Sequence, residues 1–166
     1  MSAPYEPEVA FPGTDLLAGD APSIRRVLVP VRSPGETAEA LAVAARVCRG
    51  INAVLRLVHV RVYDPPMPRC PGRFYPERVA EAEAVLDEAL VAVWRGGARA
   101  STALVEAQRG YEAEAIARYA SAWRADVIVL TRRPRWAMAR LLLGSVPDQV
   151  MRKATCPVLT VHPGHK

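Results

Sequence analysis

Five short apolar runs recur along the chain, and segments with the spacing of amphipathic helices lie between them. The runs occupy residues 27–31, 53–62, 102–105, 126–130 and 157–161. Nearly continuous apolar runs of this length are typical of strands that are covered on both faces of a parallel sheet. Alternation with helices implies right-handed crossovers. The sequence therefore predicts an α/β domain with an open five-stranded parallel sheet and helices on both faces.

The segments between the runs carry helix signals. We expect helices over residues 37–49, 79–93, 112–123 and 146–153, with Gly50 ending the first and Ser145-x-x-Asp148 capping the fourth. The predicted inward face of the second helix consists of Val79, Ala82, Leu86, Ala89, Leu90 and Val93. In the third helix we expect Ile116, Ala120 and Trp123 to point inward.

Two proline-rich stretches interrupt this pattern. Residues 1–23 show no sustained periodicity and predict an extended or disordered arm, so we place the folded domain at residues 24–162 and a short tail at 163–166. The loop over residues 63–76 carries five prolines, which exclude continuous helix or central strand over most of it. A flexible flap and an inert connector both fit its composition.

Several classes of protein do not fit this chain. No apolar run approaches the length of about 18 to 20 residues that spans a bilayer, and the acidic start lacks the features of a signal peptide. We therefore expect a cytoplasmic protein with no membrane partner. The three cysteines, Cys48, Cys70 and Cys156, are far apart and suggest neither a disulfide framework nor a metal pair.

Arginine dominates the basic residues, because only Lys153 and Lys166 are lysines in a chain of net charge +5. This excess favours anionic ligands in general. Nothing resembles a nucleic-acid recognition module, so we do not expect a nucleic-acid partner.

The apolar runs and their neighbours resemble those of the universal stress proteins of the UspA type. The resemblance rests on VLVPV, LRLVHV and ADVIVLT, and above all on the stretch LLLGSV-x3-V-x5-CPVL near the end of the chain. It covers residues 24–162 and implies the Rossmann-like, flavodoxin-like strand order 3-2-1-4-5. It also implies a non-enzymatic binding or regulatory module of the stress response, with ATP or another adenine nucleotide as ligand.

The resemblance further implies a homodimer in which the last strand pairs across the axis. The residues concerned are Val158, Leu159, Thr160 and Val161. An apolar edge strand needs cover in any case, so this expectation agrees with the physics of sheet edges.

Nucleotide-binding members of the family carry an aspartate after the first strand and a G-x2-G-x9-G-S/T signature after the fourth. This chain has Arg32 at the first position, and Thr131 and Pro134 replace the first two glycines. Proline has no N–H to offer a phosphate, and arginine replaces an acceptor by a cation. The matched positions that remain are Pro30, Val60, Gly144, Ser145 and Val146. The standard ATP grip is therefore not expected.

Three interpretations of the altered site remain open. The loop is a solvated basic segment on a degenerate site, or its arginines form a remodelled anion site, or the protein is a weak ATPase or phosphotransfer enzyme. The arginines concerned are Arg32, Arg132, Arg133, Arg135 and Arg140. Trp136 either stacks on a base or anchors the loop. His59 is expected in the core or at its rim, and His162 and His165 are not expected to bind metal.

Overall fold

The computed structural model describes residues 23–68, 71–132 and 145–162. The predicted arm before Ser23, the tail and the residues Cys70, Arg133, Pro134, Arg135, Trp136, Arg140 and Gly144 lie outside this range. The strands are β1 (Arg26–Pro30), β2 (Val54–Tyr63), β3 (Ala100–Gln108), β4 (Val127–Thr131) and β5 (Val158–Val161). The helices are α1 (Pro34–Ile51), α2 (Val79–Arg95), α3 (Glu112–Trp123) and α4 (Val146–Lys153). This element order confirms the predicted βα alternation.

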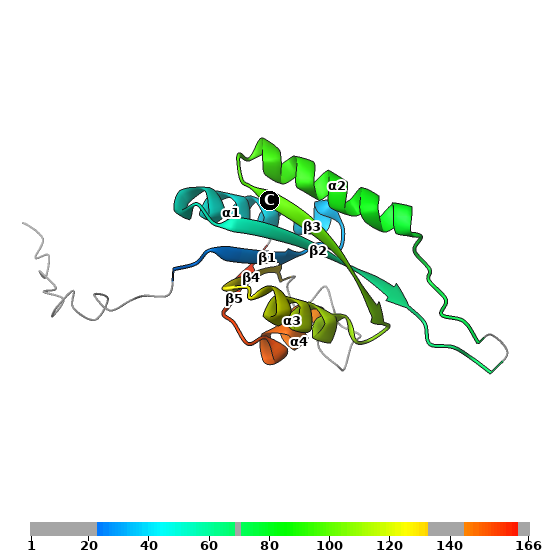
Figure 1. The fold of residues 1–166 in the computed structure, drawn as a ribbon. Helices are drawn as coiled ribbons and strands as arrows, with labels where there is room; N and C mark the ends of the chain where they lie inside the picture. The colour runs from blue at the N-terminus through cyan, green and yellow to red at the C-terminus, as the bar shows by residue number, and fades with distance from the viewer. Residues whose placement is uncertain (1–22, 69–70, 133–144, 163–166) are drawn as a thin grey trace, which may run out of the picture.

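The strands form one parallel sheet in the order β3-β2-β1-β4-β5, as predicted. The helices α1 and α2 cover one face, and α3 and α4 cover the other (Figure 1). Because side chains alternate across a strand, Val27 and Val29 of β1 enter the core under α1 and α2, whereas Leu28 enters the core under α3. All three side chains are fully buried. The central strand thus joins two apolar layers.

The structure corrects three details of the prediction. The strand β3 is longer than residues 102–105, because it pairs with β2 along nine residues even though several of its side chains are polar. Helix α1 passes Gly50 and ends at Ile51, and the next residue, Asn52, adopts the left-handed conformation that asparagine tolerates. Val79 is 45% exposed rather than inward, because it is the first residue of α2 and has no preceding turn to cover it.

The proline-rich loop is joined at its base and extends away from the domain at the carboxyl end of β2 (Figure 1). Asp64 and Phe74 form an antiparallel bridge, and the rings of Tyr63 and Tyr75 lie 5.5 Å apart. Arg61 stacks over Tyr75 at 3.8 Å and donates a hydrogen bond to Glu106. The base of the loop is thus an ordered connector, whose polar contacts the proline count did not reveal.

None of the described helices is long and apolar enough to span a membrane. Cys48 lies on the buried face of α1, and burial raises the pKa of its thiol to about 11. A thiol in this setting stays protonated at neutral pH and acts as a small apolar side chain.

Candidate functional site

A cavity of about 820 Å³ opens at the carboxyl ends of β1, β2 and β4. The sheet order reverses between β1 and β4, and ligands of such sheets bind outside the strand ends at this switch point. Its apolar floor consists of Val31, Val58, Val60, Val62, Ile116 and Leu130. The volume lies within the range of about 300 to 1,000 Å³ that small-molecule sites occupy. Size, position and lining all suit a ligand with a flat apolar part.

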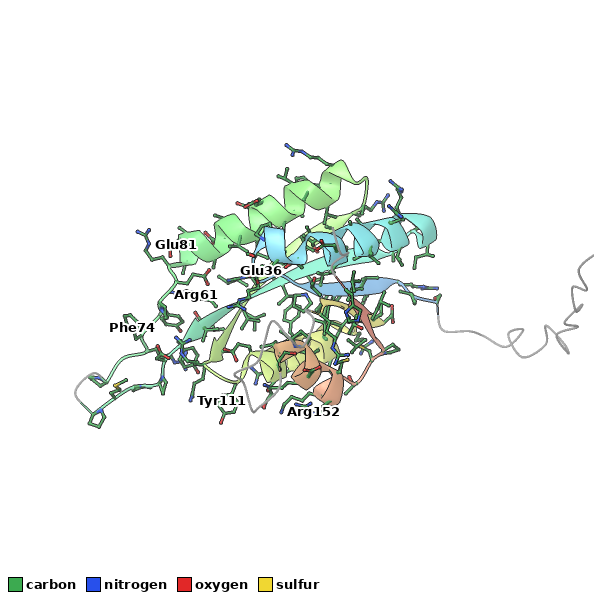
Figure 2. The ribbon with its side chains drawn as sticks, turned by 180° about the vertical axis from the view of Figure 1, so that it is seen from behind. Glu36, Arg61, Phe74, Glu81, Tyr111 and Arg152 are labelled. Carbon is green, nitrogen blue, oxygen red and sulfur yellow. The ribbon has the colours of Figure 1, made fainter. Side chains whose placement is uncertain are left out.

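Charged side chains surround this floor. The cations are Arg32, Arg109, Arg152 and Lys153, and the carboxylates are Glu36 and Glu112. Figure 2 shows Glu36 at the start of α1 and Arg152 on α4, on the two sides of the sheet edge. The Arg32 side chain is 88% exposed and its Nε lies 3.9 Å from Glu36, so it belongs to the outer rim. The cations outnumber the carboxylates, which favours a ligand with negative charge.

The N-terminus of α4 is closed by the chain itself. The Ser145 hydroxyl donates to Asp148 Oδ2 at 2.8 Å, and the Asp148 N–H donates back to Ser145 Oγ at 3.3 Å. This confirms the predicted S-x-x-D capping box. Pro147 has no N–H, so the first turn of α4 has few donors left for a phosphate. The Asp148 carboxylate already occupies the position at the N-terminus of α4 where the helix dipole would stabilise a bound anion.

Arg132 is part of this cap. Its Nη2 lies 3.2 Å from Asp148 Oδ1, its N–H donates to the Val161 carbonyl, and its side chain does not line the cavity. Among the other predicted site residues, the cavity brings together Pro30, Arg32, Val60, Thr131, Ser145 and Val146. Arg133 and Gly144 lie outside the described residues.

Thr131, which replaces the first glycine of the family signature, has an unusual environment. Its Oγ1 is buried and has no hydrogen-bond partner in the part of the chain that the structure describes. A buried hydroxyl without a partner is costly, and a polar ligand atom in the cavity could satisfy it. Thr131 is therefore a candidate contact despite the loss of glycine.

Sequence reasoning missed Arg109, Gly110 and Arg152. Arg109 follows β3 and forms a two-point contact with the Asp64 carboxylate, in which Nη2 lies 3.1 Å from Oδ2. This contact, chiefly the hydrogen bond from Arg109, lowers the pKa of Asp64. Gly110 has φ of +91°, which allows the tight turn into α3. Arg152 lies seven residues, about two turns, beyond Ser145 at the start of the same helix, and this helical spacing was the signal available in the sequence.

His59 lies in β2 between two residues of the cavity floor, Val58 and Val60. It is 5% exposed, as expected for a core or rim residue. Its Nδ1 lies 2.8 Å from the Val31 carbonyl oxygen, and its Nε2 lies 2.9 Å from Glu77 Oε2. A carbonyl oxygen only accepts, so Nδ1 donates to Val31. The ring thus connects the residue after β1 to the segment that leads into α2.

A model of the universal stress protein family matches residues 23–162. A universal stress protein of Thermus aquaticus, described by its position in the 3′ region of a QAH/OAS sulfhydrylase gene, is 36% identical over 110 residues. The match covers 64% of this chain and 77% of that relative.

Two solved structures show the same architecture. The universal stress protein from Archaeoglobus fulgidus in complex with dAMP is 26% identical, has a TM-score of 0.63, and the match covers 83% of this chain and 98% of that one. A universal stress protein in complex with cAMP has a TM-score of 0.65 over 86% of this chain and 99% of that one. At 24% identity the second likeness shows the fold alone.

Proposed function

The chain belongs to the universal stress protein family, and we propose that it is a cytoplasmic stress-response module that binds an adenine nucleotide without turning it over. The observation that carries the proposal is the cavity at the switch point, whose valine floor suits a purine and whose rim is positive. The dAMP complex of the Archaeoglobus fulgidus relative supports this ligand class.

We place the phosphate against side chains rather than against the start of α4. The first turn of α4 is closed by Asp148, and Arg132 is engaged with that carboxylate. Arg109 pairs with Asp64 and Lys153 lies 3.4 Å from Glu114. Arg152 is exposed on the cavity side and forms no ion pair within the described residues. Its guanidinium is therefore the cation best able to meet a phosphate.

The same cap supports binding without turnover. A carboxylate that acts in phosphoryl transfer must reach the nucleophile or the metal ion. Asp148, the carboxylate nearest the start of α4, is held inside the cap by Ser145 and Arg132. We therefore expect no phosphate release when the purified protein is incubated with ATP and magnesium.

Thermal-shift and calorimetric titrations with AMP, cAMP, ATP and adenosine test the proposal. A ligand present at about 100 times its Kd stabilises the folded state by about 2.7 kcal/mol, so binding is visible as a rise in Tm. We expect AMP to bind more tightly than adenosine, because only AMP presents a phosphate to Arg152. If none of these compounds raised the Tm, the proposal would be contradicted, and the interpretation of a degenerate site would stand.

Three variants make the test specific. Val60→Trp fills the floor and should abolish binding of every compound. Arg152→Gln should weaken AMP about tenfold, since a hydrogen bond to a charged group contributes about 1.5 kcal/mol or more, and should leave adenosine unchanged. Arg118→Gln, on the exposed side of α3, is the matched control. Equal losses of AMP and adenosine in Arg152→Gln would show that Arg152 does not meet the phosphate.

We also propose that the protein is a homodimer that pairs through β5. This strand is at the edge of the sheet, bonded to β4 on one side, and Leu159 is 43% exposed. An apolar edge strand presents free backbone groups to a second chain. Sedimentation should give twice the chain mass for the unmodified protein and the chain mass for Leu159→Lys. A monomeric unmodified protein would contradict this.

A further inference from the structure

Seven exposed arginines gather at the amino end of the sheet, opposite the ligand cavity. They come from the starts of strands and the ends of helices: Arg25, Arg26, Arg46, Arg49, Arg95, Arg99 and Arg124. None of these side chains forms an ion pair with a carboxylate inside the described residues. Asp126 lies among them, but its Oδ2 accepts the backbone N–H groups of Arg25 and Arg26.

Helix ends explain only part of this basic end. Arg46, Arg49, Arg95 and Arg124 lie at or near helix C-termini, where the macrodipole favours cations. Arg25, Arg26 and Arg99 precede or begin strands, and the dipole gives no reason for them. A cluster of seven like charges with a single carboxylate among them is unfavourable, so an anionic partner would stabilise it.

An apolar groove lies beside this basic end. A cavity of about 320 Å³ runs along α1 and is closed on the other side by the last residues of α2. Its floor includes Leu41, Ala45 and Val93, and Arg46 and Arg49 line it as well. Such a groove suits a segment that is both apolar and acidic.

Residues 1–22 have that composition. They contain Glu6, Glu8, Asp15 and Asp20 and no lysine or arginine, together with Val9, Phe11, Leu16 and Leu17. The described chain begins at Ser23, at the same end of the domain as the C-termini of α1 and α2 (Figure 1). Twenty-two residues reach up to about 70 Å when extended, and the 18-residue α1 is about 27 Å long. The segment is long enough to follow the whole groove.

We propose that residues 1–22 bind back onto the basic end of their own domain, with their carboxylates at Arg46 and Arg49 and their apolar side chains in the groove between α1 and α2. The short tether favours this contact over one with a free partner, because a tethered segment has a high effective concentration. Bound in this way, the segment neutralises the basic end and covers the groove.

Paramagnetic relaxation in the full-length protein tests the contact. A nitroxide is attached at Ala10→Cys in a chain that also carries Cys70→Ser and Cys156→Ser, and amide signals of the domain are recorded. We expect residues 42–49 and 92–97 to lose most of their peak intensity and β5 and the ligand cavity to keep theirs. At about 1 M salt, where the Debye length is about 3 Å, the loss should diminish. Uniform broadening, or none, would overturn the proposal.

Two further measurements separate the alternatives. Arg46→Glu with Arg49→Glu should restore the lost intensity, whereas Arg118→Glu on the opposite face should not. A mixture of two proteins reports contacts between copies. One protein carries the nitroxide and has natural-abundance nitrogen, and the other is ¹⁵N-labelled and lacks the nitroxide. Broadening that appears only in this mixture would show that the occupant is the segment of a second copy and would overturn the intramolecular contact.

Discussion

The two ends of the parallel sheet use arginine in opposite ways. At the carboxyl end, Arg61 pairs with Glu106, Arg109 with Asp64 and Arg132 with Asp148. At the amino end, the guanidinium of Arg49 donates to a carbonyl and that of Arg26 does the same. The carboxyl end therefore uses arginine mainly to organise its loops, and few cations there remain for a ligand. The amino end keeps most of its positive side chains without an ion pair among the described residues.

This contrast changes the meaning of an arginine-rich sequence. A cation near a family site invites the interpretation that it binds the ligand, yet Arg132 contacts the chain's own carboxylate. A cation far from the site, such as Arg46, has no such partner within the described residues. Charge alone does not locate the ligand; the position of the neighbouring carboxylates does.

The largest change in stability that we expect comes from the buried hydrogen bonds of His59 at the carboxyl end. His59→Ala removes hydrogen bonds to the Val31 carbonyl and to Glu77 and opens a cavity beneath the floor. Loss of a buried polar pair together with a cavity should lower the free energy of unfolding by about 3 kcal/mol. Urea denaturation measures it. His59→Asn, which can still donate to Val31, should recover part of the loss, and equal losses in both variants would show that packing alone matters.

Removal of the Asp126 carboxylate at the amino end should lower the free energy of unfolding by less than His59→Ala does. Asp126→Ala deletes the acceptor for the N–H groups of Arg25 and Arg26, which lie at 2.7 and 2.8 Å. Both N–H groups are in an exposed region where water replaces the lost bonds, so we expect a loss of about 1–2 kcal/mol in urea. Asp126→Asn retains an acceptor oxygen and is the matched control. A loss greater than that of His59→Ala would reverse the ranking of the two ends.

The fold could be predicted from the sequence because each step depends on local patterns. Apolar runs of four to ten residues, helix spacing and the Ser145 cap are periodic or short-range signals, and the structure confirms the elements they predict. The strand order 3-2-1-4-5 came from family resemblance, since no local pattern fixes which strands are neighbours. The errors at Gly50 and Val79 concern ends of helices, where tertiary contacts decide the last turn.

The candidate site could be predicted only in part. Pro30 ends β1, Val60 lies near the carboxyl end of β2 and Ser145 caps α4, and the topology brings them to one edge. The role of Arg132 depends on Asp148, which is 16 residues away, and that of Arg109 on Asp64, which is 45 residues away. Long-range ion pairs leave no periodic trace in a single sequence, so neither contact was predicted.

A smaller effect should come from backbone strain at the amino end. Arg124 ends α3 in the left-handed conformation, with φ of 55°, which disfavours residues that have a Cβ atom. Arg124→Gly should raise the free energy of unfolding by about 0.5–1 kcal/mol and also remove one unpaired cation. Asn52→Gly at the end of α1 is the control, and it should gain less because asparagine tolerates this conformation. A loss of stability in Arg124→Gly would mean that the guanidinium contributes a contact.

The smallest effect concerns the exposed pair of Arg109 and Asp64, and pH makes it measurable. The hydrogen bond from Arg109 lowers the pKa of Asp64, and the positive charge of Arg109 adds to this. Because the folded pKa lies below the unfolded one, the pair stabilises the fold above the unfolded pKa, and this stabilisation disappears as pH falls through the folded pKa. Carbon NMR titration should therefore show Asp64 ionising at a pH below about 3.9, the ordinary value, and Arg109→Gln should move the pKa of Asp64 back toward that value.

The pKa of Glu81 is the control. It is lowered by its own hydrogen bonds with Arg78 and should not move in that variant. An Asp64 titration that Arg109→Gln leaves unchanged would show that the pair does not persist in solution and that Arg109 is free to meet a ligand, which would bring the carboxyl end closer in behaviour to the amino end.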